Sequence, residues 1–382
     1  MSEAAETVEP GVKSSELKIA ILGNCQMGHL TRCLQALLGG DWPTNEWINF
    51  EILAEMADGR RDLTAYFARH DLVFMQPWIW KGLANRYPHE RHKVVLYPYI
   101  DFIAYHPDLV YVVRRDNGEP FVGPGGHYQS SLALLGWKAG LTVLETLLLY
   151  RSQVYRKLGF FDYWESSCAG VLTEGQEAGL PLDSMLEGWI ERGCFMHSVN
   201  HPKLFVIADI AKALLQRLGI GMVPGNPLAY VRDILADSVV WPVYPEIAES
   251  RGQAGSYSFK LSAPGMGPDF PVRTLGLKEF VEGSFTAFSG HAPDELGCSR
   301  LDLPPYSQLF EELRQRKPPT WTADVAAFRK SQDSANGSAS TAGGPAHDPL
   351  RLEEARQLFK PEFAFHRPPS LARRGDTGGR AL

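Results

Sequence analysis

Several features that mark particular classes of protein are scarce or missing in this chain. It has 38 basic and 44 acidic residues and a formal net charge of −6, so it lacks the cationic excess that nucleic-acid and anionic-membrane surfaces require. It has only five cysteines in 382 residues, and their odd number and wide spacing predict free thiols instead of a disulfide framework. We therefore expect no nucleic-acid partner and a cytoplasmic location, where thiols stay reduced.

Long apolar runs are missing as well. Residues 1–15 are acidic and polar and lack the apolar segment of a secretory signal, and we expect them to be disordered. The most apolar long window, residues 131–150, contains Lys138 and Glu145, which indicates a buried amphipathic helix and no membrane span. With 44% hydrophobic and 21% charged residues, the chain has the composition of an ordinary globular protein.

Short apolar runs alternate with helical patterns in the first third of the sequence. Strand-like runs cover residues 17–22, 47–53, 71–75, 93–97 and 109–113, and helical patterns cover residues 26–38 and 61–70. This alternation is typical of an α/β fold with an open, mostly parallel sheet flanked by helices. In such sheets ligands bind beyond the carboxyl ends of the strands.

The rest of the chain is predicted to be first helical and then irregular. Helical patterns cover residues 128–150, 151–158, 183–192, 203–217, 306–315 and 350–359, and strand-like fragments cover residues 239–243 and 256–261. Residues 331–344 are small and polar, and such a segment reads as a flexible linker. We predict a disordered N-terminus (1–15), an α/β domain (16–218), an irregular extension or cap (219–330), and a disordered linker and tail (331–382).

The turn Gly23-Asn24-Cys25-Gln26 joins the first strand-like run to the first helical pattern. A thiol at a helix N-terminus lies near free backbone N–H groups that favour a thiolate, and the Asn24 amide and Gln26 N–H are candidate donors to an oxyanion. Cys25 is alternatively a small buried residue of the turn. A dinucleotide loop through Gly28 is disfavoured, because Cys25 stands where that loop needs its middle glycine.

A thiol nucleophile needs a base, and the segment 195–202 supplies a candidate in His201. Pro202 suits the first position of the helix predicted over residues 203–217. His201 is therefore expected just before that helix, within a polar cluster enclosed by apolar residues.

Two other interpretations of this segment stay open. Asn200 serves equally well as a helix N-cap with surface histidines beside it. Cys194, His197 and His201 have spacing typical of zinc ligands, but a fourth ligand is lacking. We expect no metal.

Further residues are candidates for ligand binding. Gln76 follows a strand-like run and either faces a ligand or caps its loop. The candidates for a substrate pocket are Tyr99, His106 and Asn200. The candidates for an anion or cofactor site are Gly23, Arg114, Arg115, Gly125, Gly126 and His127, since glycine amides and paired arginines bind phosphate. A solvated loop is the alternative for the segment around Gly125.

The Gly-Asn-Cys-Gln turn, the strand that ends in Gln76 and the Asn200-His201-Pro202 motif resemble the WcbI-like family. Its members are proposed acetyltransferases of capsular polysaccharide biosynthesis, and the resemblance covers residues 17–218. It implies a fold similar to the SGNH hydrolases, coenzyme A binding and a nucleophile at Cys25. His201 then matches the family's late histidine, although Ser198 stands where an aspartate is usual.

The resemblance implies an enzyme that moves an acetyl group from acetyl-CoA to a sugar hydroxyl or polysaccharide precursor. Cys25 is the expected nucleophile, His201 the base, and Asn24, Gln26 and Gln76 the oxyanion donors. Three alternatives stay open: an esterase or thioesterase that uses water as the acceptor, a non-catalytic glycan- or nucleotide-binding module, and direct transfer without an acyl-enzyme.

Overall fold

The computed structural model describes residues 17–39, 62–262 and 272–315. The chain forms two compact units, the first from residues 1–105 and 164–238 and the second from residues 106–163 and 239–382. These compact units do not correspond one to one to the predicted segments. The predicted boundary between residues 218 and 219 therefore stays a prediction. The predictions made for residues 1–15, 47–53, 331–344 and 350–359 lie outside the described residues.

The first unit contains a parallel sheet of three strands in the order β1-β2-β3. These strands are β1 (Ile19–Leu22), β2 (Leu72–Met75) and β3 (Val94–Leu96), and Leu22 pairs with Met75, which pairs with Leu96. Both faces of β1 and β2 are buried, so their sequences are continuously apolar. The parallel α/β sheet and the strands predicted at 17–22, 71–75 and 93–97 are confirmed.

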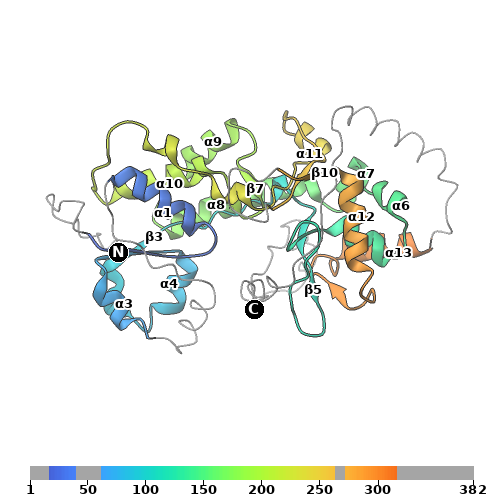
Figure 1. Cartoon of the computed structure of the whole chain (residues 1–382), viewed down its shortest axis with the longest axis horizontal. Coiled ribbons are helices and arrows are strands. Elements are labelled where there is room, and N and C mark those ends of the chain that lie inside the picture. Colours follow the sequence, from blue (N-terminus) through green and yellow to red (C-terminus); the bar gives the residue numbers. More distant parts are fainter. Residues whose placement is uncertain (1–16, 40–61, 263–271, 316–382) are drawn as a thin grey trace, which may run out of the picture. The chain divides into compact units, whose positions relative to one another are not determined.

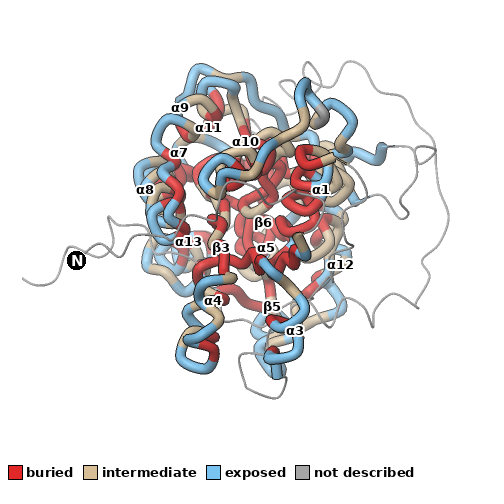
Figure 2. The backbone as a smooth tube through the Cα atoms, turned by 90° about the vertical axis from the view of Figure 1, so that its left-hand side faces the viewer, coloured by how far each residue is buried: buried red, intermediate tan, exposed pale blue. Residues whose placement is uncertain are grey.

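Helices cover both faces of this sheet. Figure 1 shows α3 (Thr64–Arg69) and α4 (Pro77–Leu83) on one face, and α1 (Met27–Leu38) and α10 (Leu204–Arg217) on the other. Apolar side chains of α3 and α4 pack against alternate residues of the strands. Most residues of α1 and β3 are buried, whereas most residues of α3 are exposed to solvent (Figure 2). The helix predicted from residue 26 is confirmed, and it ends at Gly39, which has φ 66°.

The first unit is completed by shorter elements around the sheet. They are η2 (Pro88–Lys93), η3 (Ile103–Tyr105), α8 (Trp164–Glu177), α9 (Asp183–Glu191), β7 (Met196–Ser198), β8 (His201–Pro202), η5 (Pro227–Tyr230) and η6 (Ile234–Asp237). The helices predicted at 183–192 and 203–217 are confirmed. Helix α8 was not predicted.

The second unit is built from helices and short antiparallel strand pairs. The pairs are β4 (Leu109–Tyr111) with β6 (Tyr128–Ser130), β5 (Val113–Arg114) with β11 (Leu296–Gly297), and β9 (Phe259–Lys260) with β10 (Thr274–Leu275). The helices are α5 (Ser131–Lys138), α6 (Val143–Leu147), α7 (Ser152–Lys157), η4 (Phe160–Tyr163), α11 (Pro245–Glu249), α12 (Leu277–Phe288) and α13 (Pro304–Gln315). Among the helices of both units within the described ranges, none combines the length and apolar character that crossing a membrane requires.

Two sequence predictions are wrong in this unit. The single helix expected over residues 128–150 is β6, α5 and α6, because Gly140 adopts φ 75° and Thr142 starts α6 with a capping box. The run at 109–113 does not extend the parallel sheet, since β4 pairs antiparallel with β6.

Candidate functional site

The carboxyl ends of the three parallel strands bring polar residues to one edge of the sheet. Because Leu22, Met75 and Leu96 are paired across the sheet, the residues that follow them lie at the same edge. These residues include Asn24, Gln76 and Tyr97. Polar residues therefore lie where ligands bind in sheets of this kind, and ligand binding at this edge stays a prediction.

The side-chain amide of Asn24 is held in one orientation. Its Oδ1 accepts hydrogen bonds from Gln26 N–H at 3.0 Å and from Gln76 Nε2 at 3.1 Å. Gln76 is fully buried, and its Oε1 accepts a hydrogen bond from Trp78 Nε1. No described residue accepts a hydrogen bond from Asn24 Nδ2. The amide nitrogen of Asn24 is therefore the free donor of this group, and Gln76 acts on the site by positioning Asn24.

The side chain of Gln26 ties the turn to two other segments of the first unit. Its Nε2 donates to Ile100 O at 2.6 Å and to Asn200 O at 3.0 Å, and its Oε1 accepts from Ile100 N–H. Gln26 is fully buried. Its side chain and its N–H are thus engaged within the protein, and Gln26 positions the turn instead of offering a free oxyanion donor.

Gly23 is required by the packing of Tyr97. A Cβ at Gly23 would lie 1.8 Å from the Tyr97 hydroxyl oxygen, a distance that no pair of non-bonded atoms tolerates. That hydroxyl donates a hydrogen bond to Leu22 O at 3.0 Å and is buried. The absence of a side chain at Gly23 therefore has a packing reason, whatever its role in cofactor binding.

Cys25 presents its thiol at this edge. The residue is exposed and its thiol is free. The protein packed around the turn nevertheless raises the pKa of the Cys25 thiol to about 12 by desolvation, and the N–H groups of Cys25 and Gln26 lower it by less. The backbone N–H groups at the helix N-terminus do lower the pKa of the thiol, as expected, but desolvation raises it by more. Cys25 is therefore a neutral thiol at pH 7 and needs a proton acceptor.

His201 lies on the β7–β8 hairpin, next to the Cys25 turn. Its neighbour Asn200 accepts the hydrogen bond from Gln26, and Ser198 Oγ donates to Asn200 Oδ1 at 3.4 Å. His201 is buried. Burial, and then the charges of two nearby histidines, lower the pKa of His201 to about 3. His201 is therefore neutral at pH 7 and able to accept a proton.

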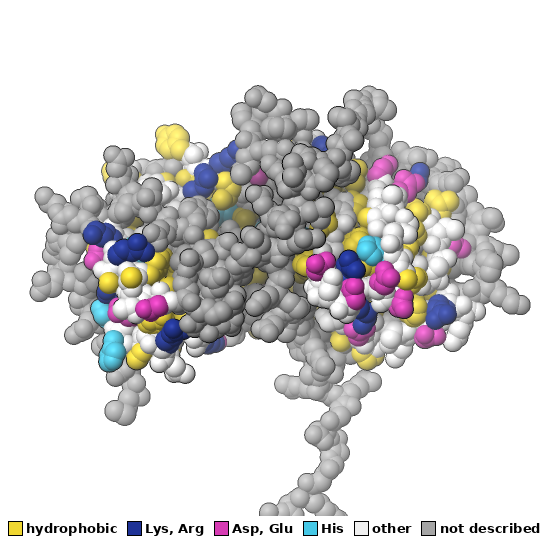
Figure 3. Space-filling view, turned by 60° about the horizontal axis from the view of Figure 1, so that its bottom comes forward, with side chains coloured by type: hydrophobic (Ala, Val, Ile, Leu, Met, Phe, Trp, Pro, Cys, Tyr) yellow, Lys and Arg dark blue, Asp and Glu magenta, His cyan; other side chains and the backbone are white. Residues whose placement is uncertain are grey.

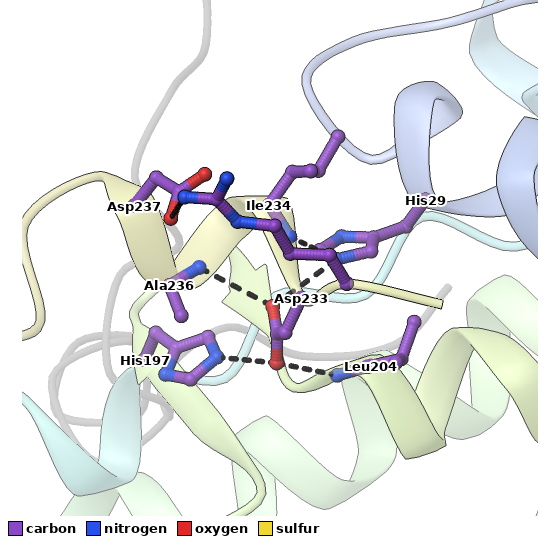
Figure 4. Close-up of polar contacts among 8 residues, drawn as sticks. His29, His197, Leu204, Asp233, Ile234, Ala236 and Asp237 are labelled. Carbon is purple, nitrogen blue, oxygen red and sulfur yellow. Dashed lines mark hydrogen bonds and ion pairs between the residues drawn. The ribbon is translucent and has the colours of Figure 1, made fainter. Parts of the chain in front are cut away.

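A carboxylate that the sequence did not reveal lies beside these histidines (Figure 4). Asp233 Oδ2 accepts hydrogen bonds from His197 Nε2 at 2.9 Å and Leu204 N–H at 3.0 Å. Its Oδ1 accepts from Ala236 N–H at 3.2 Å and lies 3.1 Å from His29 Nε2. Burial raises the pKa of Asp233, but the hydrogen bonds from His197 and His29 outweigh it and hold the pKa well below its ordinary value.

Two weak signals for this group exist in the sequence. His29 follows Cys25 by four residues, the spacing of one helical turn. Asp233 begins a short helix as its N-cap. Neither signal predicts that the two residues meet. In the described segments, no three His, Cys, Asp or Glu side chains are placed to hold a metal ion, and Cys194 Sγ donates instead to Met196 O.

Of the residues predicted for the anion or cofactor site, Gly23 lies in the first unit, and the others, Arg114, Arg115, Gly125, Gly126 and His127, lie in the second unit. Arg114 pairs with Asp116 at 2.8 Å and Arg115 with Asp302 at 3.0 Å. These pairs are exposed and therefore weak, and phosphate binding by the two arginines stays a prediction. Figure 3 shows that acidic and basic side chains are interspersed on the face it draws, so neither sign of charge dominates there.

The loop residues Gly125, Gly126 and His127 were also predicted to bind the cofactor, but the structure gives other reasons for the two glycines. A Cβ at Gly125 would lie 2.4 Å from Tyr128 O, and Gly126 has φ 63°. Burial lowers the pKa of His127, so this histidine is neutral and weakly suited to a phosphate. Phosphate binding by this loop stays a prediction.

The residues predicted for the substrate pocket fall in different units. Tyr99 and Asn200 belong to the first unit, where Tyr99 N–H donates to Glu174 Oε2 at 3.2 Å. His106 is buried in the second unit, with its Nδ1 3.4 Å from Pro242 O. The Gln26 side chain bonds Asn200 O and the backbone of Ile100, the residue that follows Tyr99. These contacts place Asn200 and the backbone of Tyr99 near the Cys25 turn, and they do not place His106 there.

Comparison with known proteins identifies related sequences. The chain matches the protein family described as "Polysaccharide biosynthesis enzyme WcbI" over residues 18–222. It is also similar to a solved structure of WcbI, described as a novel polysaccharide biosynthesis enzyme in its native form without a disulfide bond between coenzyme A and a cysteine. That similarity has 15% sequence identity and a TM-score of 0.49, and covers 81% of this chain and 98% of the other. No curated protein matches the chain.

Proposed function

The chain belongs to the WcbI family of polysaccharide biosynthesis enzymes, and from this membership and the Cys25 turn we propose that it is an acyltransferase. The donor is an acyl-CoA, with acetyl-CoA expected, and the acceptor is a hydroxyl of a sugar or polysaccharide precursor. An SGNH-like arrangement, with the nucleophile directly after the first strand, and a cytoplasmic location are part of this proposal.

One observation carries the proposal: the exposed residue Cys25 directly follows Asn24, whose amide nitrogen has no partner in the described structure. The Oδ1 of Asn24 is occupied by Gln26 N–H and Gln76 Nε2, so its Nδ2 is left to bind another acceptor. An oxygen that becomes negatively charged on a carbonyl carbon bonded to Cys25 is such an acceptor. Two buried residues fix this donor, as transition-state stabilisation requires.

The reaction consists of two acyl transfers. In the first, the Cys25 sulfur attacks the thioester carbon of acyl-CoA, the bond to the CoA sulfur breaks, and CoA leaves as a thiol after it takes one proton. One thioester replaces another, so this step is nearly balanced in free energy. In the second, a sugar hydroxyl attacks the acyl-Cys25 carbon, an oxygen ester forms and the Cys25 thiol is regenerated.

A histidine moves the protons in both steps. We assign this role to His201, because the Gln26–Asn200 hydrogen bond holds its hairpin against the Cys25 turn. His201 takes the thiol proton and gives it to the departing CoA sulfur, and it takes the hydroxyl proton in the second step. Since the pKa of His201 is lowered to about 3, the protonated form needs a nearby negative charge.

The experiment compares Cys25→Ala with a matched control, Cys168→Ala, which removes a free thiol from α8. We expect Cys25→Ala to stop CoA release from acetyl-CoA while calorimetry still detects CoA binding, and the control to retain both. Turnover in Cys25→Ala would contradict the covalent mechanism. Release of free acetate without any sugar acceptor would instead identify a hydrolase. If the wild type does not bind CoA, a non-catalytic glycan- or nucleotide-binding module would be favoured.

A further inference from the structure

Asp233 is the most heavily hydrogen-bonded carboxylate of the site region, and the proposed reaction leaves it without a role. Three donors reach its two oxygens: Leu204 N–H, Ala236 N–H and His197 Nε2. His29 Nε2 lies 3.1 Å from its Oδ1. The two backbone donors fix the carboxylate, so the contacts with the histidines fix the histidines in turn.

The Nε2 of His29 faces two partners with opposite requirements. It lies 3.1 Å from Asp233 Oδ1, which needs a donor, and 2.9 Å from the backbone nitrogen of Ile234, which needs an acceptor (Figure 4). The nitrogen serves one of these partners at a time. The Nδ1 of His29 is buried and has no hydrogen-bond partner among the described residues. Both contacts of the ring therefore run through Asp233 and the residue that follows it.

We propose that Asp233 is the positioning carboxylate of the acyl-transfer site, which holds His197 and His29 and offsets the positive charge gained when the thiol proton arrives. This inference rests on the proposed function. When Cys25 transfers its proton to His201, that residue gains one positive charge, and the negative charge of Asp233, which raises the pKa of His201, offsets it. Asp233 itself stays unprotonated throughout, as the carboxylate of a catalytic triad does.

The charges around Asp233 agree with this role. The titratable groups that face it are His29 and Cys33 from α1, His197 from β7 and His201 from β8. Burial keeps Cys33 and His201 neutral at pH 7, because it raises the pKa of the thiol and lowers that of the imidazole, so Asp233 supplies the negative charge of the group. Its field raises the pKa of His201, against the lowering caused by burial and the other histidines.

Asp233 lies outside the residues that match the family. The match covers residues 18–222, whereas the carboxylate comes from the segment that follows α10. Ser198, which stands where an aspartate is usual before the family's late histidine, donates to Asn200 Oδ1. The carboxylate of this site is therefore supplied by a different segment from the one that the sequence motif suggests.

The test replaces Asp233 with Asn and uses Asp237→Asn as the matched control. Asp237 lies on the same short helix, its side chain is 25% exposed against 26% for Asp233, and it pairs with Arg232. The readout is single-turnover acetylation of Cys25 by acetyl-CoA, followed by intact mass between pH 5 and 9. We expect Asp233→Asn to slow acetylation about 10²-fold or more, with CoA binding unchanged, and Asp237→Asn to match the wild type.

The pH profile separates a charge effect from a structural one. A histidine beside an ionised carboxylate is the stronger base, so removal of the charge should lower the rate at every pH from 5 to 9, a range in which His201 stays unprotonated. Asp233→Glu, which keeps the charge, should recover part of the rate over the same range. A wild-type rate and profile in Asp233→Asn would overturn the inference alone, and so would equal losses in the Asn and Glu variants.

The test also gives a result if the wild type is not acetylated or if the Asp233→Asn variant does not fold. If the wild type does not acetylate Cys25 at all, the proposed function fails, and this inference fails with it. If Asp233→Asn does not fold, ¹⁵N NMR of the histidines in the wild type decides. The proposal requires that His197 Nε2 carries the proton that Asp233 Oδ2 accepts, and an Nε2 without a proton in His197 would overturn it.

Discussion

The contact between Gly23 and Tyr97 allows the packing of the Cys25 turn to be tested by a double-mutant cycle. In Gly23→Ala the new Cβ would lie 1.8 Å from the Tyr97 hydroxyl oxygen, so the hydroxyl must move. It then loses its hydrogen bond to Leu22 O, which costs about 1–3 kcal/mol when the group stays buried. Overpacking adds about 1–3 kcal/mol. We expect the free energy of unfolding to fall by about 2–6 kcal/mol.

Tyr97→Phe removes the clashing oxygen and rescues the first substitution. Alone it loses one hydrogen bond, about 1 kcal/mol. In the double variant the nearest remaining atom of residue 97 is the ring carbon at 3.1 Å from the Cβ, which small shifts accommodate. The double variant should therefore be more stable than the sum of the single changes predicts, by about 2 kcal/mol.

The assay is urea unfolding combined with hydrogen exchange of the amides in β1 and α1, which reports on the first unit separately from the second. Gly170→Ala is the control, because a Cβ there meets no atom within 4 Å, and in helix α8 it should raise stability by about 0.5–1 kcal/mol. If the two substitutions add to within about 0.5 kcal/mol, the steric explanation of Gly23 is refuted.

Three further predictions concern the chemistry of the site. Asn24→Asp keeps an oxygen for Gln26 N–H and Gln76 but removes the Nδ2 donor, so acyl transfer should slow about 10²–10³-fold while thermal unfolding is unchanged. Wild-type rates would exclude Asn24 as the donor. Because the pKa of Cys25 is raised to about 12, its alkylation by iodoacetamide should accelerate about tenfold per pH unit from pH 7 to 9, and a plateau below pH 8 would contradict this. The lowered pKa of His201, about 3, means that its proton is bound at pH 5 only in the unfolded chain. Its contribution to stability is therefore present above about pH 6.5 and is lost as the pH falls, by about 2 kcal/mol between pH 7 and 5, a loss that urea unfolding should show to be smaller in His201→Gln.

The parallel sheet and the nucleophile turn were predictable because their signals are local. Continuous apolar runs gave β1 and β2, a helical pattern stopped by Gly39 gave α1, and the turn between them follows from the order of these elements. The predicted helix over residues 128–150 failed for a local reason as well. Gly140 and the capping residue Thr142 stop one helix and start the next within that apolar window, and those signals outweigh hydrophobicity.

The partners of the polar groups were not predictable, because they are distant in sequence. Asp233 lies 36 residues from His197, and the Ile234 N–H that reaches His29 lies 205 residues from it. Nothing in the periodicity of either segment predicts that they meet. The same holds for the side-chain amide of Gln76, which donates to Asn24 Oδ1 52 residues away. The Gln26 N–H, which was the predicted donor, is instead engaged locally by the same oxygen.

The central claim is that Cys25 carries the acyl group during transfer. The most direct measurement is the intact mass of the wild-type chain after incubation with acetyl-CoA, followed by peptide mapping. We expect a single acetyl adduct on Cys25 that disappears when a sugar acceptor is added and does not form in Cys25→Ala. Sugar acetylation by the wild type without such an adduct, or an adduct that maps to another residue and turns over, would contradict the account.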